Sequence, residues 1–525
     1  MTIDRSLASR DRKWNWLAIA LIVPIVLLSI RSFAAAFTPG LNSDHAVHVL
    51  MAYHLKLPDD FYYWGQDRLG SLVPVLSHFL LKILPLPVVV VVSIVQYGLL
   101  IFGYLCLASL LRHAVSRLAL ALVWFLPLVP FTELDFIGQP YGPQIALIGA
   151  ACVAIDRLSQ TKKIGQKRLW LATATACLFF SLWVSDFTIV PLFLLSLWGL
   201  SQLYKAWKLR EKTVIKDAVT VLLTAGLGVA FVEFAKNNAS SRRNYSSFAT
   251  PEQSIEMLRR LLTSFWNTLT FQTNNLFLSW HAILAVILLG YLAWAIAAHR
   301  QKILRSTSRW FYLFLGTVAI GMPLLLISFW VYRNGLNLRY FTVIYVMAWL
   351  AVLLLIEALP TNLARTATIL MLMTAIASSL SLPLFVYTIQ RPIAQIQQLQ
   401  EIKALGNAGF IGDYWRSYIL CSVDPANLNC TPHDPKGKTP CPPADAPPHL
   451  RSSRPVRAGV RCRRCIPQVF ASDTIYLVKD KWLNRFPAET EQFRRCLVRA
   501  GRPQKVSGYT IAPYRIKAAA ERRSS

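Results

Sequence analysis

Long apolar runs alternate with short polar connections along most of the chain. The run from Val88 to Leu111 contains no charged residue, and the run from Trp14 to Phe37 contains only Arg31. Leu276–Ala298 and Trp310–Tyr332 are similar in length and apolarity. A bilayer-spanning helix needs roughly 20 apolar residues, and lipid offers the backbone no other partners. Each run therefore predicts a membrane-spanning helix.

About eleven windows of this kind can be recognised. They cover residues 15–37, 88–111, 116–131, 141–157, 169–185, 187–206, 217–235, 276–298, 310–332, 339–358 and 366–388. Basic residues gather in every second connection between them, and these connections are the short ones. Because positive loops stay in the cytoplasm, the alternation predicts a multi-pass membrane protein of defined orientation. Its N-terminus lies in the cytoplasm, and everything after residue 389 lies outside.

The composition agrees with a membrane protein. Hydrophobic residues make up 54% of the 525 positions and charged residues 15%, whereas soluble domains carry about 25% charged residues. The net charge of +29 would indicate a nucleic-acid partner in a soluble protein. Here the basic residues lie in the connections where membrane topology requires them and in the C-terminal stretch. No nucleic-acid motif accompanies them, so we expect no nucleic-acid partner.

The predicted topology divides the chain into two parts. Residues 1–389 form an all-α membrane domain, and residues 390–525 form a small α/β domain outside the membrane. In the second part the pattern predicts a helix over 390–406, a loop leading into a strand near 410–418, a strand over 474–478, a helix over 481–500 and a strand over 506–514. The outer connections of the membrane domain are 38–87, 132–140, 236–275 and 333–338.

The first outer connection carries an acidic residue, Asp44, at the start of an amphipathic helical stretch. Ser43 or Asp44 suits the N-cap of that helix, so a purely structural role is one alternative. A functional role is the other, because a run of aromatic and polar residues follows, including Tyr63 and Gln66. That run leads into an apolar helix over 72–84, which lies on the membrane or enters it at a shallow angle.

Two carboxylates, Glu133 and Asp135, occupy the second outer connection. In an extended backbone alternate residues point to the same face, and paired carboxylates suit a hard divalent cation or a sugar. Pro140 and Gly142 mark the segment as a turn, so a solvated turn without function is the alternative. A divalent metal ion held by Asp44, Glu133 and Asp135 is one hypothesis, and the sequence identifies no other cofactor.

Two arginines, Arg333 and Arg339, bracket a tight outer turn between two late windows, and Tyr340 follows them. Positive charge on the outer side runs against the topology pattern. Long basic side chains can reach lipid headgroups from such positions. The planar guanidinium group also suits the phosphate of a lipid-linked substrate. The turn is therefore either a surface anchor or part of a substrate site.

Residues 431–467 form an irregular stretch rich in Pro, Arg and Cys. A Cys-x-x-Cys pair within it can bind zinc, but a second pair is missing and an outer compartment favours disulfides. The composition favours a disordered insert still more, and a local shift of reading frame is a further alternative. The candidate ligands are His433, Cys430, Cys441, Cys462 and Cys465.

Three short motifs resemble the GT-C membrane glycosyltransferases. They are Ser43-Asp44-His45-Ala46, the later Tyr63-Trp64-Gly65-Gln66, and Arg339-Tyr340 at the start of a late window. The bacterial relatives of protein O-mannosyltransferases and of the lipid A aminoarabinose transferase are the most similar group. Glu133-x-Asp135 lies where such enzymes often hold a second acidic motif. The resemblance covers residues 15–390, and His45 stands where many relatives have Glu.

The resemblance implies a glycosyltransferase of a bacterial inner or plasma membrane, whose donor is a sugar on a polyprenyl phosphate, such as undecaprenyl phosphate. The acceptor is a hydroxyl of a lipid, glycan or protein on the outer face, and the reaction inverts the sugar. Asp44 is then the general base, and the arginines stabilise the leaving phosphate. The expected substrate-binding residues are Tyr63, Gln66, Glu133, Asp135, Arg333, Arg339 and Tyr340.

A transporter or flippase for a lipid-linked glycan or a small solute is the alternative function. Such a protein is expected to carry charges or Gly/Pro breaks at mid-membrane and paired repeats. In this chain the acidic residues cluster near the outer surface instead, which favours the transferase. A structural or assembly protein without catalysis remains a third alternative.

Overall fold

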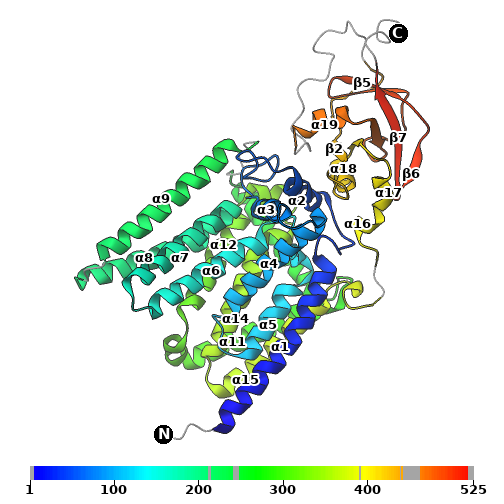
Figure 1. Cartoon of the computed structure of the whole chain (residues 1–525). Coiled ribbons are helices and arrows are strands. Elements are labelled where there is room, and N and C mark those ends of the chain that lie inside the picture. The colour runs from blue at the N-terminus through cyan, green and yellow to red at the C-terminus, as the bar shows by residue number, and fades with distance from the viewer. Residues whose placement is uncertain are drawn as a thin grey trace.

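The computed structural model describes residues 5–210, 214–240, 247–389, 392–437, 439–441 and 462–517. Long helices run side by side through its first part, and a mixed sheet lies beyond one end of them (Figure 1). The long helices are α1 (Arg5–Phe33), α4 (Val88–Ala108), α5 (Ala114–Phe125), α6 (Tyr141–Gln160), α7 (Ile164–Val184), α8 (Ile189–Lys208), α9 (Val214–Asn238), α11 (Leu276–Ser306), α12 (Arg309–Leu326), α14 (Thr342–Ala358) and α15 (Thr361–Leu380).

Shorter elements fill the connections between the long helices. The expected apolar helix over 72–84 is present as α3 (Leu72–Leu81). The other short elements are α2 (Ser43–His54), α10 (Pro251–Leu269) and α13 (Phe329–Arg333), with 3-10 turns η1 (Val129–Leu134), η2 (Asp186–Thr188), η3 (Leu338–Phe341) and η4 (Leu384–Val386).

Every predicted window is occupied by a helix, and the chain is a multi-pass membrane protein. Eight helices of the described ranges are long and apolar enough to cross a membrane, namely α1, α4, α8, α9, α11, α12, α14 and α15. Three further predicted spans do not meet these criteria of length and apolarity. α5 has 12 residues and is about 18 Å long, against a hydrocarbon core of roughly 30 Å. α6 and α7 are long enough, but polar side chains reduce their apolarity.

Small residues allow the helices to approach closely at the centre of the bundle. A Cβ atom on Gly103 of α4 would lie 2.7 Å from the Cβ of Ala146 on α6. Trp124 of α5 is fully buried beside this contact, and its indole Nε1 donates to the carbonyl of Leu100 at 3.0 Å. Close backbone packing of this kind replaces the hydrophobic driving force that is missing between helices in lipid.

The two sets of connections predicted from the charge pattern lie at opposite ends of the bundle. At one end the Glu357 carboxylate accepts from the backbone N–H groups of Arg112 and His113 at 3.0 Å. At the same end, Asp156 in the last turns of α6 and Arg309 at the start of α12 form an ion pair of 2.5 Å. The connections of the other set meet at the opposite end, where α2 contacts the 132–140 connection.

A seven-stranded mixed sheet forms the C-terminal part. The strand order is β2-β1-β3-β7-β5-β4, with β6 paired to β7. β1 is parallel to β2 and β3, and the remaining pairs are antiparallel. The strands are β1 (Ala408–Gly412), β2 (Leu428–Pro432), β3 (Thr474–Val478), β4 (Glu489–Gln492), β5 (Arg495–Arg499), β6 (Gln504–Val506) and β7 (Tyr509–Ile516), accompanied by α16 (Gln395–Gln398), α17 (Gln400–Lys403), α18 (Tyr414–Cys421) and α19 (Cys465–Ala471).

The sequence predictions for this part are confirmed in some places and wrong in others. The strand over 474–478 is confirmed, and the strand over 506–514 is present as β7. The helix over 481–500 is wrong, because β4 and β5 form a hairpin there whose turn places Phe493 and Arg494 at positive φ. Pairing across the sheet outweighs the local helical pattern.

Two boundary predictions in the same part are also corrected. Residues 410–418 are a strand followed by a helix, not a loop followed by a strand. Asp413 caps that helix, α18, by accepting from the backbone N–H of Trp415 at 2.9 Å, so the chain turns into a helix directly after β1. The helix expected over 390–406 is present only as the short helices α16 and α17, with residues 390–391 outside the described ranges.

Disulfides, not zinc, engage the cysteines of the C-terminal part. Each bond links cysteines that the sheet and its helices bring together. One group of possible metal ligands in the described ranges consists of Cys441, Glu489 and Cys496, but both of these thiols are oxidised. Residues 442–461, which make up most of the irregular stretch, lie outside the described ranges. The bonds are Cys421–Cys430, Cys441–Cys496 and Cys462–Cys465.

Candidate active site

Asp44 lies in the first turn of α2 and not at its cap. Asn42 is the N-cap: its side-chain oxygen accepts from the backbone N–H of His45 at 3.1 Å. The His45 Nδ1 accepts in turn from the backbone N–H of Asn42 at 3.1 Å. The expectation that Ser43 or Asp44 caps the helix is therefore wrong. Because capping does not use the Asp44 carboxyl, this partly buried group is available for chemistry.

The backbone of Asp44 is held from two sides. The Tyr63 hydroxyl lies 3.1 Å from the Asp44 carbonyl oxygen, to which it donates. His48 places its Nδ1 3.1 Å from the same oxygen. The rings of His48 and Tyr63 are in contact, with centroids 5.0 Å apart. Tyr63, an expected substrate-binding residue, thus positions Asp44 through the backbone.

The 132–140 connection packs directly on α2. The His45 ring stacks on Phe136 with centroids 4.8 Å apart and an interplanar angle of 19°. A Cβ on Gly138 would lie 2.5 Å from the His45 Cδ2 and 3.2 Å from the Asp44 Cβ. Only glycine permits this approach, which brings the second outer connection against the residue that carries the Asp44 carboxyl.

The two carboxylates of that connection do not share a face. Glu133 lies within η1, and Asp135 follows it in a helical conformation, so the expected extended Glu-x-Asp geometry is wrong. Glu133 is partly buried, and burial raises its pKa to about 7. The positive charge of Arg339 opposes this shift and the negative charge of Asp44 adds to it. Asp44, Glu133 and Arg339 are therefore close enough to interact electrostatically.

Asp135 points into the helix bundle. It is fully buried, and burial raises the pKa of its carboxyl well above the usual range. Gln96 of α4 donates to the backbone carbonyl of Asp135. Neither carboxyl oxygen of Asp135 has a hydrogen-bond partner in the described part of the chain. Burial without a hydrogen-bond partner favours the neutral form of this carboxyl.

The arrangement does not fit the hypothetical metal site. Within the described ranges, Asp44, Glu133 and Asp135 do not bring oxygen ligands within 4.8 Å of one another. Burial also favours the neutral form of the Asp135 carboxyl, which is a poorer ligand for a hard cation than a carboxylate.

Arg339 faces Glu133 from the late outer turn. Its Nη2 lies 3.4 Å from the Tyr340 hydroxyl, and its guanidinium carbon lies 5.2 Å from the centroid of the Tyr340 ring. Its Nε is buried and has no hydrogen-bond partner among the described residues. Arg333, the other predicted arginine, is exposed at the end of α13. Arg339 is thus the better placed of the two to bind an anion.

Arg68 is a charged residue that the sequence analysis did not select. The Gln66 side-chain oxygen accepts from the Arg68 Nε at 3.5 Å, and the Arg68 guanidinium lies 4.5 Å from the Trp330 ring centroid. Gln66 is buried, so this predicted residue acts by orienting Arg68. Arg68 follows Gln66 by two residues in the first outer connection. Only the fold shows that its guanidinium lies on Trp330 of α13.

The C-terminal part docks onto the first outer connection through a common hydrophobic core. Val47 and Met51 of α2 pack in one cluster with Phe410 of β1 and Tyr418 of α18. Above α2, the Tyr414 hydroxyl donates to the Asp44 Oδ1. No sequence pattern indicates this contact, because 370 residues separate the two positions.

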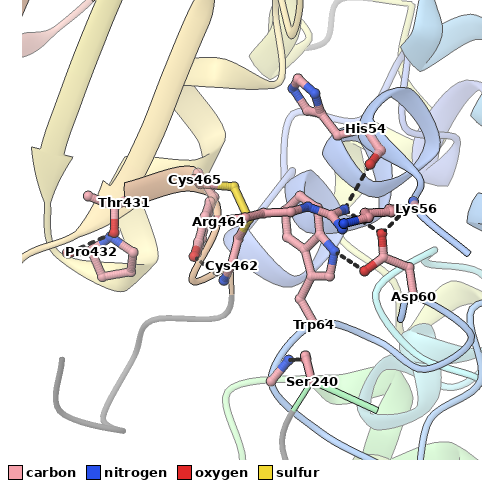
Figure 2. Close-up of a disulfide and its surroundings, with 12 residues drawn as sticks. His54, Lys56, Asp60, Trp64, Ser240, Thr431, Pro432, Cys462, Arg464 and Cys465 are labelled. Carbon is pink, nitrogen blue, oxygen red and sulfur yellow. Dashed lines mark hydrogen bonds and ion pairs between the residues drawn. A yellow bond between two sulfur atoms is a disulfide. The ribbon is translucent and has the colours of Figure 1, made fainter. Parts of the chain in front are cut away.

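A second contact between the two parts surrounds the Cys462–Cys465 disulfide (Figure 2). Arg464, inside the four-residue loop that this bond closes, forms an ion pair with the buried carboxylate of Asp60. Its Nη2 also donates to the His54 carbonyl at 2.8 Å, and its guanidinium lies 5.5 Å from the Trp64 ring centroid. The Trp64 indole Nε1 donates to the same carboxylate at 3.0 Å.

The stability of the protein is expected to fall as the pH drops from about 6.5 to 4, because α2 buries two neutral histidines. Burial lowers the pKa of His45 to about 3 and that of His48 to about 4. In the unfolded chain both histidines bind protons below about pH 6.5. The free energy of unfolding therefore falls by roughly 1.4 kcal/mol per pH unit for each histidine as the pH drops. In thermal unfolding, the His48→Gln variant should show about half of the combined pH dependence of the two histidines. His113→Gln is the control: the His113 side chain is exposed, so this variant should keep the pH dependence of the wild-type protein.

No protein-family model and no curated protein sequence matches the chain. Among solved structures, the chain is similar to the oligosaccharyltransferase of Archaeoglobus fulgidus in the apo form, with a TM-score of 0.40 and 12% identity over 79% of this chain. The chain spans 64% of the length of that protein. It is similar to ArnT from Cupriavidus metallidurans in the apo state, with a TM-score of 0.40 and 8% identity over 96% of this chain and 98% of ArnT. ArnT bound to undecaprenyl phosphate gives a TM-score of 0.40 and 10% identity over 95% and 98% of the two chains.

Proposed function

We propose that the chain is a membrane glycosyltransferase that moves a sugar from a polyprenyl-phosphate donor to an acceptor hydroxyl. The observation that carries this proposal is that Glu133 lies within electrostatic reach of both Asp44 and Arg339, beside a bundle of apolar helices. A base, a hydrogen-bonding carboxyl and an anion-binding guanidinium are the groups that such a transfer needs. Their place beside membrane helices suits a donor whose prenyl chain stays in the bilayer.

The reaction can be written with these groups alone. Asp44 takes the proton of the acceptor hydroxyl as its oxygen attacks the anomeric carbon of the sugar. The bond from that carbon to the phosphate oxygen breaks, and the lipid phosphate leaves with the electron pair. Arg339 stabilises the charge that develops on the phosphate. Attack opposite to the leaving group inverts the sugar.

Glu133 suits the role of a donor-orienting residue. With a pKa of about 7 its carboxyl is partly protonated at neutral pH, so it can donate as well as accept hydrogen bonds from sugar hydroxyls. Tyr340 lies against Arg339 and limits its movement. Arg333 lies at the exposed rim of the same turn, where a charge can attract the donor phosphate without binding it tightly.

The orientation of the protein is part of the proposal. The end of the bundle that carries the basic connections faces the cytoplasm, and Asp44 and the sheet lie on the outer side. The cysteines support this placement, because the disulfides lie in the C-terminal part. Disulfides persist in oxidising compartments and are rare in the cytosol. The free cysteines of the described ranges are Cys106, Cys152 and Cys177, all of which lie in bundle helices.

The test is sugar transfer by the purified protein in lipid vesicles. Undecaprenyl phosphates that carry different sugars serve as donors, and glycosylated product and free undecaprenyl phosphate are quantified together. Equimolar formation of both by the wild-type protein supports the proposal. Movement of the intact donor across the vesicle membrane without product would instead indicate a flippase.

In this assay Arg339→Gln is expected to raise the donor KM by about tenfold to a hundredfold, since it removes a charge-assisted contact to phosphate. Arg339→Lys should restore only part of the loss, because an ammonium group cannot form the paired contacts of a guanidinium. Arg365→Gln is a matched control, because Arg365 is exposed at the opposite end of α14 and α15. An unchanged donor KM in Arg339→Gln would remove Arg339 from the donor site.

A further inference from the structure

Tyr414 is the first residue of α18, and its backbone is anchored to α2. The Ser43 hydroxyl donates to the Tyr414 carbonyl at 2.5 Å. The Tyr414 hydroxyl returns to the neighbouring residue and donates to the Asp44 Oδ1. The side-chain hydroxyl of Ser43 and the carboxyl of Asp44 are thus both bound by Tyr414, which fixes the start of α18 over the start of α2.

The packing around Tyr414 restricts the movement of its ring. The ring lies edge-on to Trp415, with centroids 5.0 Å apart, and edge-on to Tyr418, with centroids 5.9 Å apart. Tyr418 is fully buried in the core that α18 shares with α2. Packing against the buried Tyr418 and the partly exposed Trp415 therefore holds the Tyr414 hydroxyl at Asp44.

We infer that Tyr414 is a positioning residue for the base of the transfer reaction, supplied by the C-terminal part. The inference rests on the proposed function. A carboxylate has two oxygens, and Tyr414 occupies Oδ1, which leaves Oδ2 to accept the proton of the acceptor hydroxyl. A hydroxyl that donates to the charged form of a carboxylate stabilises that form and fixes its orientation. The catalytic base is complete only when the sheet is docked.

Tyr414→Phe is the direct test, since it removes one oxygen atom and keeps the ring. We expect kcat for sugar transfer to fall by about tenfold to a hundredfold, the range for a hydrogen bond to a charged group. Donor and acceptor KM should stay within about threefold, because neither substrate loses a contact.

Tyr476→Phe is the matched control, since Tyr476 lies on β3 of the same sheet and stacks on Phe410. This variant should keep kcat and both KM values. Wild-type activity in Tyr414→Phe, or a higher kcat, would overturn the inference, because it would mean that the hydroxyl does not assist the base.

A double-mutant cycle in thermal unfolding separates this inference from the proposed function. Tyr414→Phe and Asp44→Ala, each of which removes one partner of the contact, are measured singly and together, and the shifts in Tm are expected to be non-additive because the two side chains are in contact. Additive shifts would overturn the inference even if the wild-type protein transfers sugar. A wild-type protein that transfers no sugar, together with non-additive shifts, would overturn the proposed function and leave the contact between the two parts supported.

Discussion

Replacement of Asp44 by Asn is expected to lower kcat for sugar transfer by about a hundredfold to ten-thousandfold, the usual contribution of a general base. Asn keeps the size of the side chain and an oxygen that can accept from the Tyr414 hydroxyl, so the docking of α18 on α2 should survive. An amide cannot take a proton from the acceptor, so the loss should appear in kcat while the donor KM changes little. Steady-state kinetics in vesicles would measure both constants.

Asp59→Asn is the matched control for this variant. Asp59 belongs to the same outer connection, its side chain is 50% exposed, and it pairs loosely with Lys56 at 4.0 Å. Exposed pairs of this kind contribute little to stability, so the control should keep full activity. Undiminished transfer by Asp44→Asn would exclude Asp44 as the base.

The second large effect is expected on stability, from Arg464→Met. The Asp60 side chain is 2% exposed and its carboxylate would lose its positive partner, which for a buried pair costs about 3–5 kcal/mol. Burial raises the pKa of Asp60 and the ion pair with Arg464 lowers it again. Without Arg464 the carboxyl is ionised at a higher pH, so the loss should be larger at pH 8 than at pH 5. Thermal unfolding at the two values would measure it.

Arg463→Met is the matched control, because Arg463 is the exposed neighbour in the same disulfide loop. It should unfold like the wild-type protein. The double variant Asp60→Asn with Arg464→Met should recover part of the stability, since no unpaired charge is then left in the interface. If Arg463→Met and Arg464→Met unfold alike at both pH values, the ion pair does not hold the two parts together.

The two parts of the chain differ in how well their sequence predicts their structure. A run such as Val88–Leu111 predicts its own helix, because lipid excludes every other backbone conformation for a segment of that length. In the sheet, by contrast, residues 481–500 carry a helical pattern but form β4 and β5. Their conformation depends on β7 and on Cys441, which are distant in sequence, so no local pattern can decide it.

The candidate site shows the same division. Asp44, Glu133 and Arg339 were found from the sequence, because charged residues beside membrane spans are few and conspicuous. The sequence did not predict that Asp135 is buried in the bundle. The expectation assumed an extended backbone, whereas the 3-10 helix η1 points Glu133 and Asp135 in different directions. Nor could the sequence reveal Arg68 or Tyr414, whose contacts depend on how loops and helices pack.

The sequence by itself determined that this protein crosses the membrane many times and which polar residues lie at the ends of the helices. Length and apolarity suffice for that, because each membrane helix satisfies its backbone hydrogen bonds internally. Only the tertiary structure decided which of these residues meet. Asp44 and Tyr414 are 370 positions apart, and Asp60 and Arg464 are 404 positions apart. Contacts over such distances arise from the shared core of α2, β1 and α18, which the alternation of polar and apolar residues does not encode.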